Sequence, residues 1–215
     1  VFIDRFENIN GKECYGIAVD LGTTTIAVYL CNTTKGRILS SLSVKNPQVL
    51  YGDDVMSRIG AIGLDDSNLG HLQSLVVRAI EWGVKDLFSS LNLEENIISH
   101  MVVVGNPTMI HILAGVDPNP IGVSPYQPAF YKAKRIHSND LGFNLDSFPI
   151  QTLPQISGFI GGDILSAAIA ADLENKADGT LLVDLGTNGE LMLKANGKFY
   201  ATSCATGPAF EGASL

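Results

Sequence analysis

The chain has 215 residues, 46% of them hydrophobic and 17% charged, which is the composition of a globular protein with a sizeable core. A net charge of −8 argues against nucleic acid as a partner, because phosphate contacts need clustered lysine and arginine. No apolar run reaches the roughly 18 residues of a membrane span, so no membrane partner is expected. A nucleotide is not excluded, because Mg²⁺ and backbone N–H groups can neutralise its phosphates.

The cysteines and the first residues suggest where the protein resides. Cys14, Cys31 and Cys204 lie far apart and form neither a CxxC pair nor an iron–sulfur spacing, so we expect a reducing cytoplasm. The first six residues include two charges with no apolar stretch behind them, so no signal peptide is expected. The sequence begins at Val1 rather than at a methionine, and we expect it to be part of a larger protein.

Residues 15–44 are expected to form a three-stranded meander. Ile17–Leu21 and Ile26–Leu30 are apolar, largely β-branched runs separated by a glycine and three threonines, and Arg37–Val44 follows a second turn. A helix is expected at about Asp53–Ile62. A longer one is expected from residue 69 to residue 91, where apolar residues recur at helical spacing.

The middle of the chain changes character after a short apolar strand. Met101–Val104 is that strand, and Asn106 is expected to cap a short helix with Pro107 in its first turn. The Pro-rich residues 116–154 are expected to form a long irregular excursion with one or two short strands. Such excursions are often functional or partner-binding.

A second meander is expected near the end of the chain, at Leu181–Leu185, Glu190–Lys194 and Lys198–Ser203. It follows a helix at Ile164–Leu173 that is rich in small residues and permits close approach of another helix. If the face of this helix is exposed, it favours a homodimer.

The two meanders share a pentapeptide, Val-Asp-Leu-Gly-Thr, at Val19–Thr23 and at Val183–Thr187. Its identical place in both meanders indicates a duplicated unit whose halves face each other. Each Asp interrupts an apolar strand and is expected to be buried, which is tolerated where the strand opens on a cleft that holds a cation. The glycine allows close backbone approach to a ligand, and the threonines supply donors for phosphate oxygens.

These patterns predict a Mg-nucleotide phosphate site. Asp20 and Asp184 are predicted catalytic residues that reach Mg²⁺ through its waters. The predicted phosphate contacts are Gly22, Thr23, Thr24, Thr25, Gly186, Thr187, Asn188 and Gly189. The alternative is that Asp-Leu-Gly-Thr is turn chemistry alone, with Asp bonded to its own backbone. The sequence contains neither GxxxxGK[ST] nor GxGxxG after a strand.

Ile17–Leu30 and Leu181–Leu193 resemble the first and second phosphate motifs of the actin, sugar-kinase and heat-shock-chaperone ATPases. Gly158–Leu173 resembles their first connecting helix. The resemblance implies an α/β, ribonuclease H-like fold with a duplicated β-meander and flanking helices. It also implies ATP and Mg²⁺ as cofactors.

The same resemblance implies two subdomains. Residues 1–157 would form the first, with the first phosphate hairpin and the Pro-rich excursion. Residues 158–215 would form the connecting helix and the start of the second. An adenosine-binding Gly-Gly segment and a second connecting helix should follow, and the sequence ends before them. The second half is therefore expected to be incomplete, which puts adenine binding by this chain in doubt.

Three segments resemble the C-terminal domain of the reductive activators of corrinoid proteins: Asn46-Pro47-Gln48 with Tyr51–Val55 and Arg58, then Val104–Met109, then Cys204–Ala213. This resemblance covers essentially the whole chain. It implies ATP hydrolysis coupled to Co(II)-to-Co(I) reduction on a corrinoid (iron–sulfur) protein or corrinoid methyltransferase. The family's electron enters through an N-terminal [2Fe–2S] domain that this sequence lacks, so the chain alone is expected to be inactive.

Three residues have two interpretations each. Asp163 is a helix N-cap by its position, but its counterpart in the related ATPases lies near the attacking water, so it is also a predicted catalytic residue. Glu190 faces either the cleft or solvent. Asn106 is a helix cap or a ligand. Two alternative functions stay open: a small-molecule (sugar-type) kinase of the same fold, and a non-catalytic nucleotide-binding scaffold.

Overall fold

The structure of the chain is a computed structural model, and it describes residues 14–94 and 97–206. The first residues, which bear on the absence of a signal peptide, lie outside this range, as does the segment 207–213 of the family resemblance. Within the described part, no helix combines the length and apolar character needed to cross a membrane.

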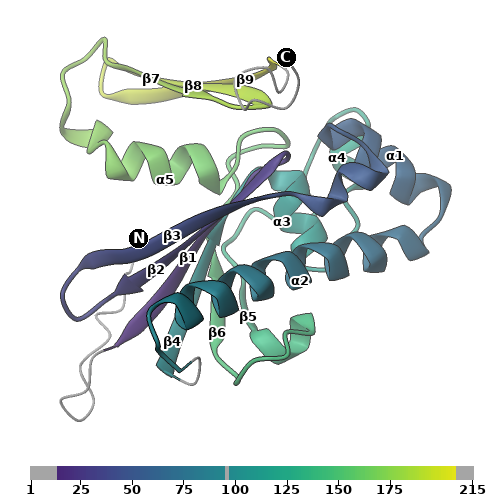
Figure 1. The fold of residues 1–215 in the computed structure, drawn as a ribbon. Coiled ribbons are helices and arrows are strands. Elements are labelled where there is room, and N and C mark those ends of the chain that lie inside the picture. The colour runs from purple at the N-terminus through teal and green to yellow at the C-terminus, as the bar shows by residue number, and fades with distance from the viewer. Residues whose placement is uncertain (1–13, 95–96, 207–215) are drawn as a thin grey trace.

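A six-stranded mixed sheet forms the larger layer, in the order β3-β2-β1-β4-β6-β5 (Figure 1). The predicted first meander is confirmed, and its antiparallel strands are β1 (Tyr15–Leu21), β2 (Thr25–Asn32) and β3 (Arg37–Lys45). β4 (Ile98–Val104) runs parallel to β1 and β6 (Pro149–Thr152) parallel to β4, while β5 (Arg135–His137) pairs antiparallel with β6.

Helices cover the sheet where the apolar periodicity predicts them. The described helices of this part are η1 (Pro47–Tyr51), α1 (Val55–Leu64), α2 (Ser67–Ser90), α3 (Pro107–Leu113) and α4 (Asn119–Gly122). α2 packs its apolar stripe on β2 and β3 and closes the main core. α1 begins two residues later than predicted, because Asp54 is the residue that caps it by accepting from Ser57 N–H at 2.8 Å.

The Pro-rich segment contributes to the sheet more than predicted. Its two short strands are confirmed, but β6 inserts between β4 and β5 and so becomes part of the main sheet. In the sequence, η3 (Ser138–Leu141) lies between β5 and β6. Phe143, Phe148 and Ile150 of the same segment are buried in the main core. Part of this segment therefore belongs to the main sheet and its core.

α5 (Gly162–Ala170) lies between the large sheet and a second, three-stranded sheet (Figure 1). The second sheet is the predicted second meander, β7 (Leu181–Leu185), β8 (Asn188–Ala195) and β9 (Lys198–Ala205), in sequence order. Ile164 and Ala168 of α5 pack with Met192 of β8 in a second core cluster. The helix ends three residues before the predicted Leu173, and Asp172 takes a left-handed conformation before η4 (Leu173–Asn175).

Candidate nucleotide-binding cleft

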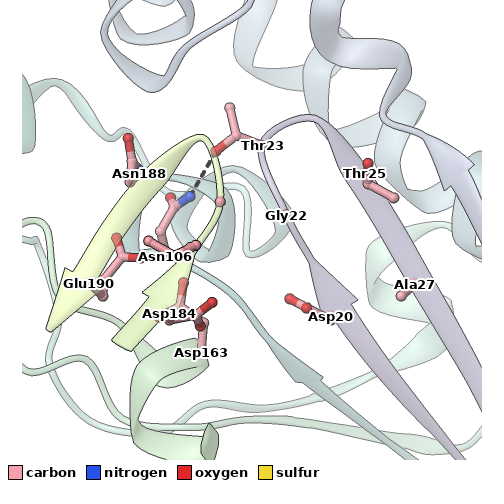
Figure 2. Close-up of a pocket in the computed structure, with 12 residues that line it drawn as sticks. Asp20, Gly22, Thr23, Thr25, Ala27, Asn106, Asp163, Asp184, Asn188 and Glu190 are labelled. Carbon is pink, nitrogen blue, oxygen red and sulfur yellow. Dashed lines mark hydrogen bonds between the residues drawn. The ribbon is translucent and has the colours of Figure 1, made fainter. Parts of the chain in front are cut away.

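The two Val-Asp-Leu-Gly-Thr hairpins face each other across an open cleft of about 330 Å³ (Figure 2). The first hairpin forms one wall, the second hairpin forms the other, and the N-terminal end of α5 lies at the base. The lining residues are Asp20, Gly22, Thr23, Thr25, Ala27, Asn106, Asp163, Asp184, Leu185, Gly186, Asn188 and Glu190.

The cleft thus gathers most of the predicted site residues, although their roles stay predictions. Thr24, Thr187 and Gly189 do not line it. Gly189 is absent from the lining because neighbouring residues of a strand face opposite sides of the sheet, and Asn188 and Glu190 on either side of it face the cleft. A Cβ on Gly189 would lie 2.7 Å from Thr206 Cγ2, so this position faces Thr206 and has room for it because glycine has no side chain.

A hydrogen bond joins the two walls directly. Thr24 Oγ1 and Thr187 Oγ1, both buried, lie 2.7 Å apart. These two hydroxyls therefore bond to each other in this structure. The threonines of the first hairpin that line the cleft are Thr23 and Thr25. The bond shows that the threonines of the two turns meet, although Thr187 corresponds in the repeat to Thr23 and not to Thr24.

We expect Thr24→Val to lower the stability of the intact protein by roughly 1 kcal/mol, because valine keeps the shape and removes one partner of a buried hydrogen bond. Thr187→Val should have a similar effect, and the double variant should lose less than the sum of the two. Denaturant unfolding of the three variants measures this coupling. Thr202→Val, at an exposed β9 position, is the control. Strictly additive losses from Thr24 and Thr187 would contradict the bridge.

The first hairpin is tight, and its tip is held by Asn106. A Cβ on Gly22 would lie 2.5 Å from Thr25 O, so glycine is required here by the turn itself. Asn106 Oδ1 accepts from Met109 N–H at 3.0 Å, which confirms the predicted helix cap. Its Nδ2 also donates to Thr23 Oγ1 at 3.0 Å, so one side chain both caps α3 and orients a threonine of the cleft.

The second hairpin is supported by Thr206, the residue after β9. Thr206 Oγ1 donates to Gly186 O at 2.5 Å and also lies 3.2 Å from Thr187 O. Gly186 N–H donates to Asn188 O at 3.2 Å and closes the turn. Thr206 belongs to the segment Cys204–Ala213 that resembles the activator family, and its contacts give part of that segment a structural role.

Close packing brings Asp163 to the cleft. A Cβ on Gly161 would lie 2.5 Å from Gly105 O, so α5 starts directly against the end of β4 only because glycine stands there. Gly161 is the N-cap residue, which makes the N-cap interpretation of Asp163 wrong. Asp163 lies in the first turn, where its Oδ1 accepts from Ile164 N–H at 2.8 Å, and its carboxylate lies at the cleft with Asp20 and Asp184 (Figure 2).

The burial expected for the two repeated aspartates is wrong for Asp20, which is exposed at the cleft, while Asp184 is half-buried. The deeply buried acid of the cleft is Glu190, with 6% of its surface exposed. Asp184 and Glu190 are register partners in β7 and β8, so both side chains lie on the same face of the second sheet. Glu190 therefore faces the cleft, and the solvent interpretation is wrong.

Burial and neighbouring charge shift two acids of this cleft. Burial, followed by the negative charges of Asp20 and Asp184, raises the pKa of Asp163 to about 6. Burial, then the charges of Asp163 and Asp184, raises the pKa of Glu190 to about 7, although a hydrogen bond from Ser203 Oγ at 3.0 Å opposes the shift. The cleft therefore concentrates negative charge that a cation would relieve.

The donor set suits a hard cation held through water. Carboxylate oxygens are the ligands that Mg²⁺ prefers, and Mg²⁺ keeps several waters when it binds to proteins. Among the residues the structure describes, no cluster of three or more His, Cys, Asp or Glu side chains is close enough to hold a metal by itself. Asp20 and Asp184 fit Mg²⁺ through bridging waters, and this role is a proposal.

Comparison with known proteins identifies the family. A family model described as the RACo middle region matches residues 15–176, and one described as the C-terminal domain of RACo, the ASKHA domain, matches residues 178–215. This chain belongs to the RACo family. A solved reductive activator for corrinoid, iron–sulfur protein is 31% identical and superposes with a TM-score of 0.92, over 96% of this chain and 33% of that one.

Two characterised relatives agree with this assignment. The corrinoid activation enzyme RamQ of Eubacterium limosum is 31% identical over 97% of this chain and 35% of its own length. The [Co(II) methylated amine-specific corrinoid protein] reductase of Methanosarcina barkeri is 23% identical over 92% of this chain and 37% of its own. This chain thus spans about a third of each relative. The predicted ATPase-type α/β fold is confirmed, and the kinase alternative is not favoured.

Proposed function

We propose that this chain binds Mg-ATP between its two hairpins, and that ATP hydrolysis there drives Co(II)-to-Co(I) reduction on a corrinoid partner protein. The observation that carries the proposal is the convergence of Asp20 and Asp184, equivalent residues of a duplicated motif, on one cleft. The names of the relatives support the corrinoid part. They do not name a nucleotide, which rests on the cleft itself.

The residues of the cleft divide the chemistry between them. Backbone N–H groups at Gly22–Thr23 and Thr187–Asn188 would hold the phosphates from opposite walls, which is the positioning that phosphoryl transfer mostly requires. Asp20 and Asp184 would hold Mg²⁺ through waters, and Mg²⁺ supplies neutralisation of phosphate charge when bound. Gly189 is not proposed as a contact, since it faces away.

Glu190 is proposed to orient the attacking water. Its carboxylate lines the cleft, and the Ser203 hydroxyl on the neighbouring strand donates to it at 3.0 Å. A pKa of about 7 leaves it half ionised near neutral pH, where a carboxylate can accept a proton from water as bond formation proceeds. Asp163, at the base of the cleft, is proposed to hold the same water from the α5 side.

The two-walled cleft suggests how hydrolysis is coupled to work on a partner. Loss of the terminal phosphate would remove the ligand that both walls share, and the walls belong to different sheets. A change in their separation would alter the surface offered to a corrinoid iron–sulfur protein or corrinoid methyltransferase. The [2Fe–2S] domain, the cytoplasmic location and a homodimer through the exposed side of α5 are further parts of this proposal.

The experiment mixes the intact protein, Mg-ATP, a low-potential reductant and a corrinoid protein in the Co(II) state, and follows the Co(I) absorption. We expect Co(I) to form only with hydrolysable ATP and the partner present. Phosphorylation of a small molecule, detected as a new phosphate signal by ³¹P NMR, would instead support the kinase alternative. Nucleotide binding without turnover under any condition would support the scaffold.

A further inference from the structure

Arg58 is completely buried, although arginine is normally retained inside a protein only with an acidic partner. It projects from α1 and donates to neutral acceptors alone. Nη2 donates to Thr23 O at 2.6 Å, Nε to Gly52 O at 3.0 Å, and Nη1 to Gln48 Oε1 at 2.9 Å, with Met109 Sδ 3.1 Å from Nη1. Within residues 14–94 and 97–206, no carboxylate oxygen lies within 4.0 Å of it.

The charge of Arg58 persists despite this environment. Burial lowers the pKa of Arg58 to about 10, and the more distant charges of Asp54 and Asp53 oppose the shift. The guanidinium is therefore protonated at neutral pH. A buried cation without an adjacent anion costs free energy in the folded protein, and hydrogen bonds to neutral groups recover only a part of it.

The acceptor Thr23 O lies at the tip of the first hairpin. Its two neighbours are held by a second residue, since Asn46 Nδ2 donates to Gly22 O at 2.9 Å and Asn46 N–H donates to Thr24 O at 2.7 Å. Three successive carbonyls are thus fixed from the side of α1 and η1. In a trans peptide the N–H points opposite to the C=O, so the N–H groups that follow these carbonyls point away from Arg58 and Asn46.

A charged donor also changes the peptide it binds. Hydrogen bonds in a chain polarise one another in a low-dielectric interior, so a carbonyl that accepts from guanidinium makes the N–H of the same peptide a stronger donor. The peptide concerned joins Thr23, which lines the cleft, to Thr24, which does not. Arg58 therefore acts on the cleft through the position that it gives to Thr23 and through the positive charge that it places behind this wall.

We propose that Arg58 is a positioning residue and a buried counter-charge for the first hairpin, which it holds in shape for polyphosphate and makes electrostatically attractive to it. The proposal rests on the nucleotide function of the cleft. It assigns to the Asn46–Pro47–Gln48 and Arg58 segments, which lie outside the cleft lining, a role in binding. It also gives the unpaired guanidinium a compensating anion in the ligand-bound state.

The test measures Mg-ATP affinity by calorimetry for the intact wild-type protein, Arg58→Met and Arg58→Lys, with melting temperatures of each. Arg58→Met should raise the Kd by at least about tenfold. Arg58→Lys keeps the charge and loses the planar fork, so its Kd should lie between the two. Steady-state kinetics should show a raised KM, whereas a smaller folded fraction alone would lower kcat and leave KM unchanged.

The control is Arg78→Met, the same chemical change at an exposed position of α2, which should leave the Kd unchanged. A Kd for Arg58→Lys equal to that of wild type overturns the proposal, and this holds even if Arg58→Met does not fold. A folded Arg58→Met with wild-type affinity also overturns it. If wild type binds no Mg-ATP, the nucleotide function falls as well. If only Asp20→Asn weakens binding, the role of Arg58 alone is wrong.

Discussion

Replacing Asp20 with asparagine is expected to lower kcat/KM for ATP hydrolysis by about 100- to 1000-fold in the intact protein, the range seen when one preorganised electrostatic partner is removed from an active site. Asparagine keeps the size of the side chain and removes the negative charge that would hold a cation through water. The fold should survive, because Asp20 is exposed at the cleft and is not a core residue.

The same variant separates binding from turnover. In calorimetry without Mg²⁺, Asp20→Asn should bind ATP at least as well as wild type, because one negative charge facing the phosphates is gone. With Mg²⁺ it should bind more weakly than wild type. Asp86→Asn, an equal charge change on the exposed side of α2, is the control and should have wild-type activity. A fully active Asp20→Asn would show that the repeated aspartates do not form a Mg-nucleotide site.

Replacing Glu190 with glutamine is expected to lower kcat by roughly 100-fold or more while Mg-ATP binds with nearly unchanged affinity, because general base catalysis contributes about 10²–10⁴ in rate. Glutamine keeps the hydrogen bond to Ser203 and cannot accept a proton. Single-turnover hydrolysis measures the chemical step and excludes slow product release as the cause. A kcat within a few-fold of wild type would remove Glu190 from the mechanism.

Thermal unfolding of the protein without nucleotide tests the charge of Glu190 separately. Its pKa is raised in the folded state to about 7 from an ordinary 4.5, so between these values the folded protein keeps a proton that the unfolded chain has lost. Stability therefore falls as pH rises through this window. Glu190→Gln should gain in melting temperature over wild type at pH 8 and have no comparable gain at pH 4.5. A pH-independent difference would contradict the shift.

Much of the fold could be predicted from local patterns, because the strands and helices with the clearest apolar patterns are the ones that form the main core. The β-branched runs gave β1 and β2, the helical spacing of apolar residues gave α2, and Asn106 with Pro107 gave the start of α3. The pairing of β6 with β4 could not be predicted, since a four-residue strand in a Pro-rich segment has no periodicity of its own. Its place depends on the β4 strand, about fifty residues earlier.

The repeat was enough to predict which residues lie on the two walls of the candidate site. It was not enough to predict which way the side chains of the second hairpin point. The duplicated pentapeptide placed Asp20 and Asp184 on opposite walls. Strand alternation is the sequence feature that indicates the direction of Glu190, because Asn188 and Glu190 share one face of β8 and Gly189 lies on the other. The Thr24–Thr187 bond depends on how two sheets meet, which no local pattern contains.

The contacts of Arg58 show a second limit. The segment with Asn46 and Arg58 was visible as a family feature, yet nothing in its composition shows that its side chains hold the carbonyls of Gly22, Thr23 and Thr24. That relation joins residues more than twenty positions apart. A structure was needed to turn the resemblance into a physical role.

In the proposed function, the two hairpins hold the phosphates of one nucleotide between them. A crystal structure of the intact protein with Mg²⁺ and a non-hydrolysable ATP analogue tests it most directly. We predict that the phosphates lie between Gly22–Thr23 and Gly186–Asn188, with Mg²⁺ linked through waters to Asp20 and Asp184. A nucleotide bound elsewhere, with this cleft holding only solvent, would contradict the account.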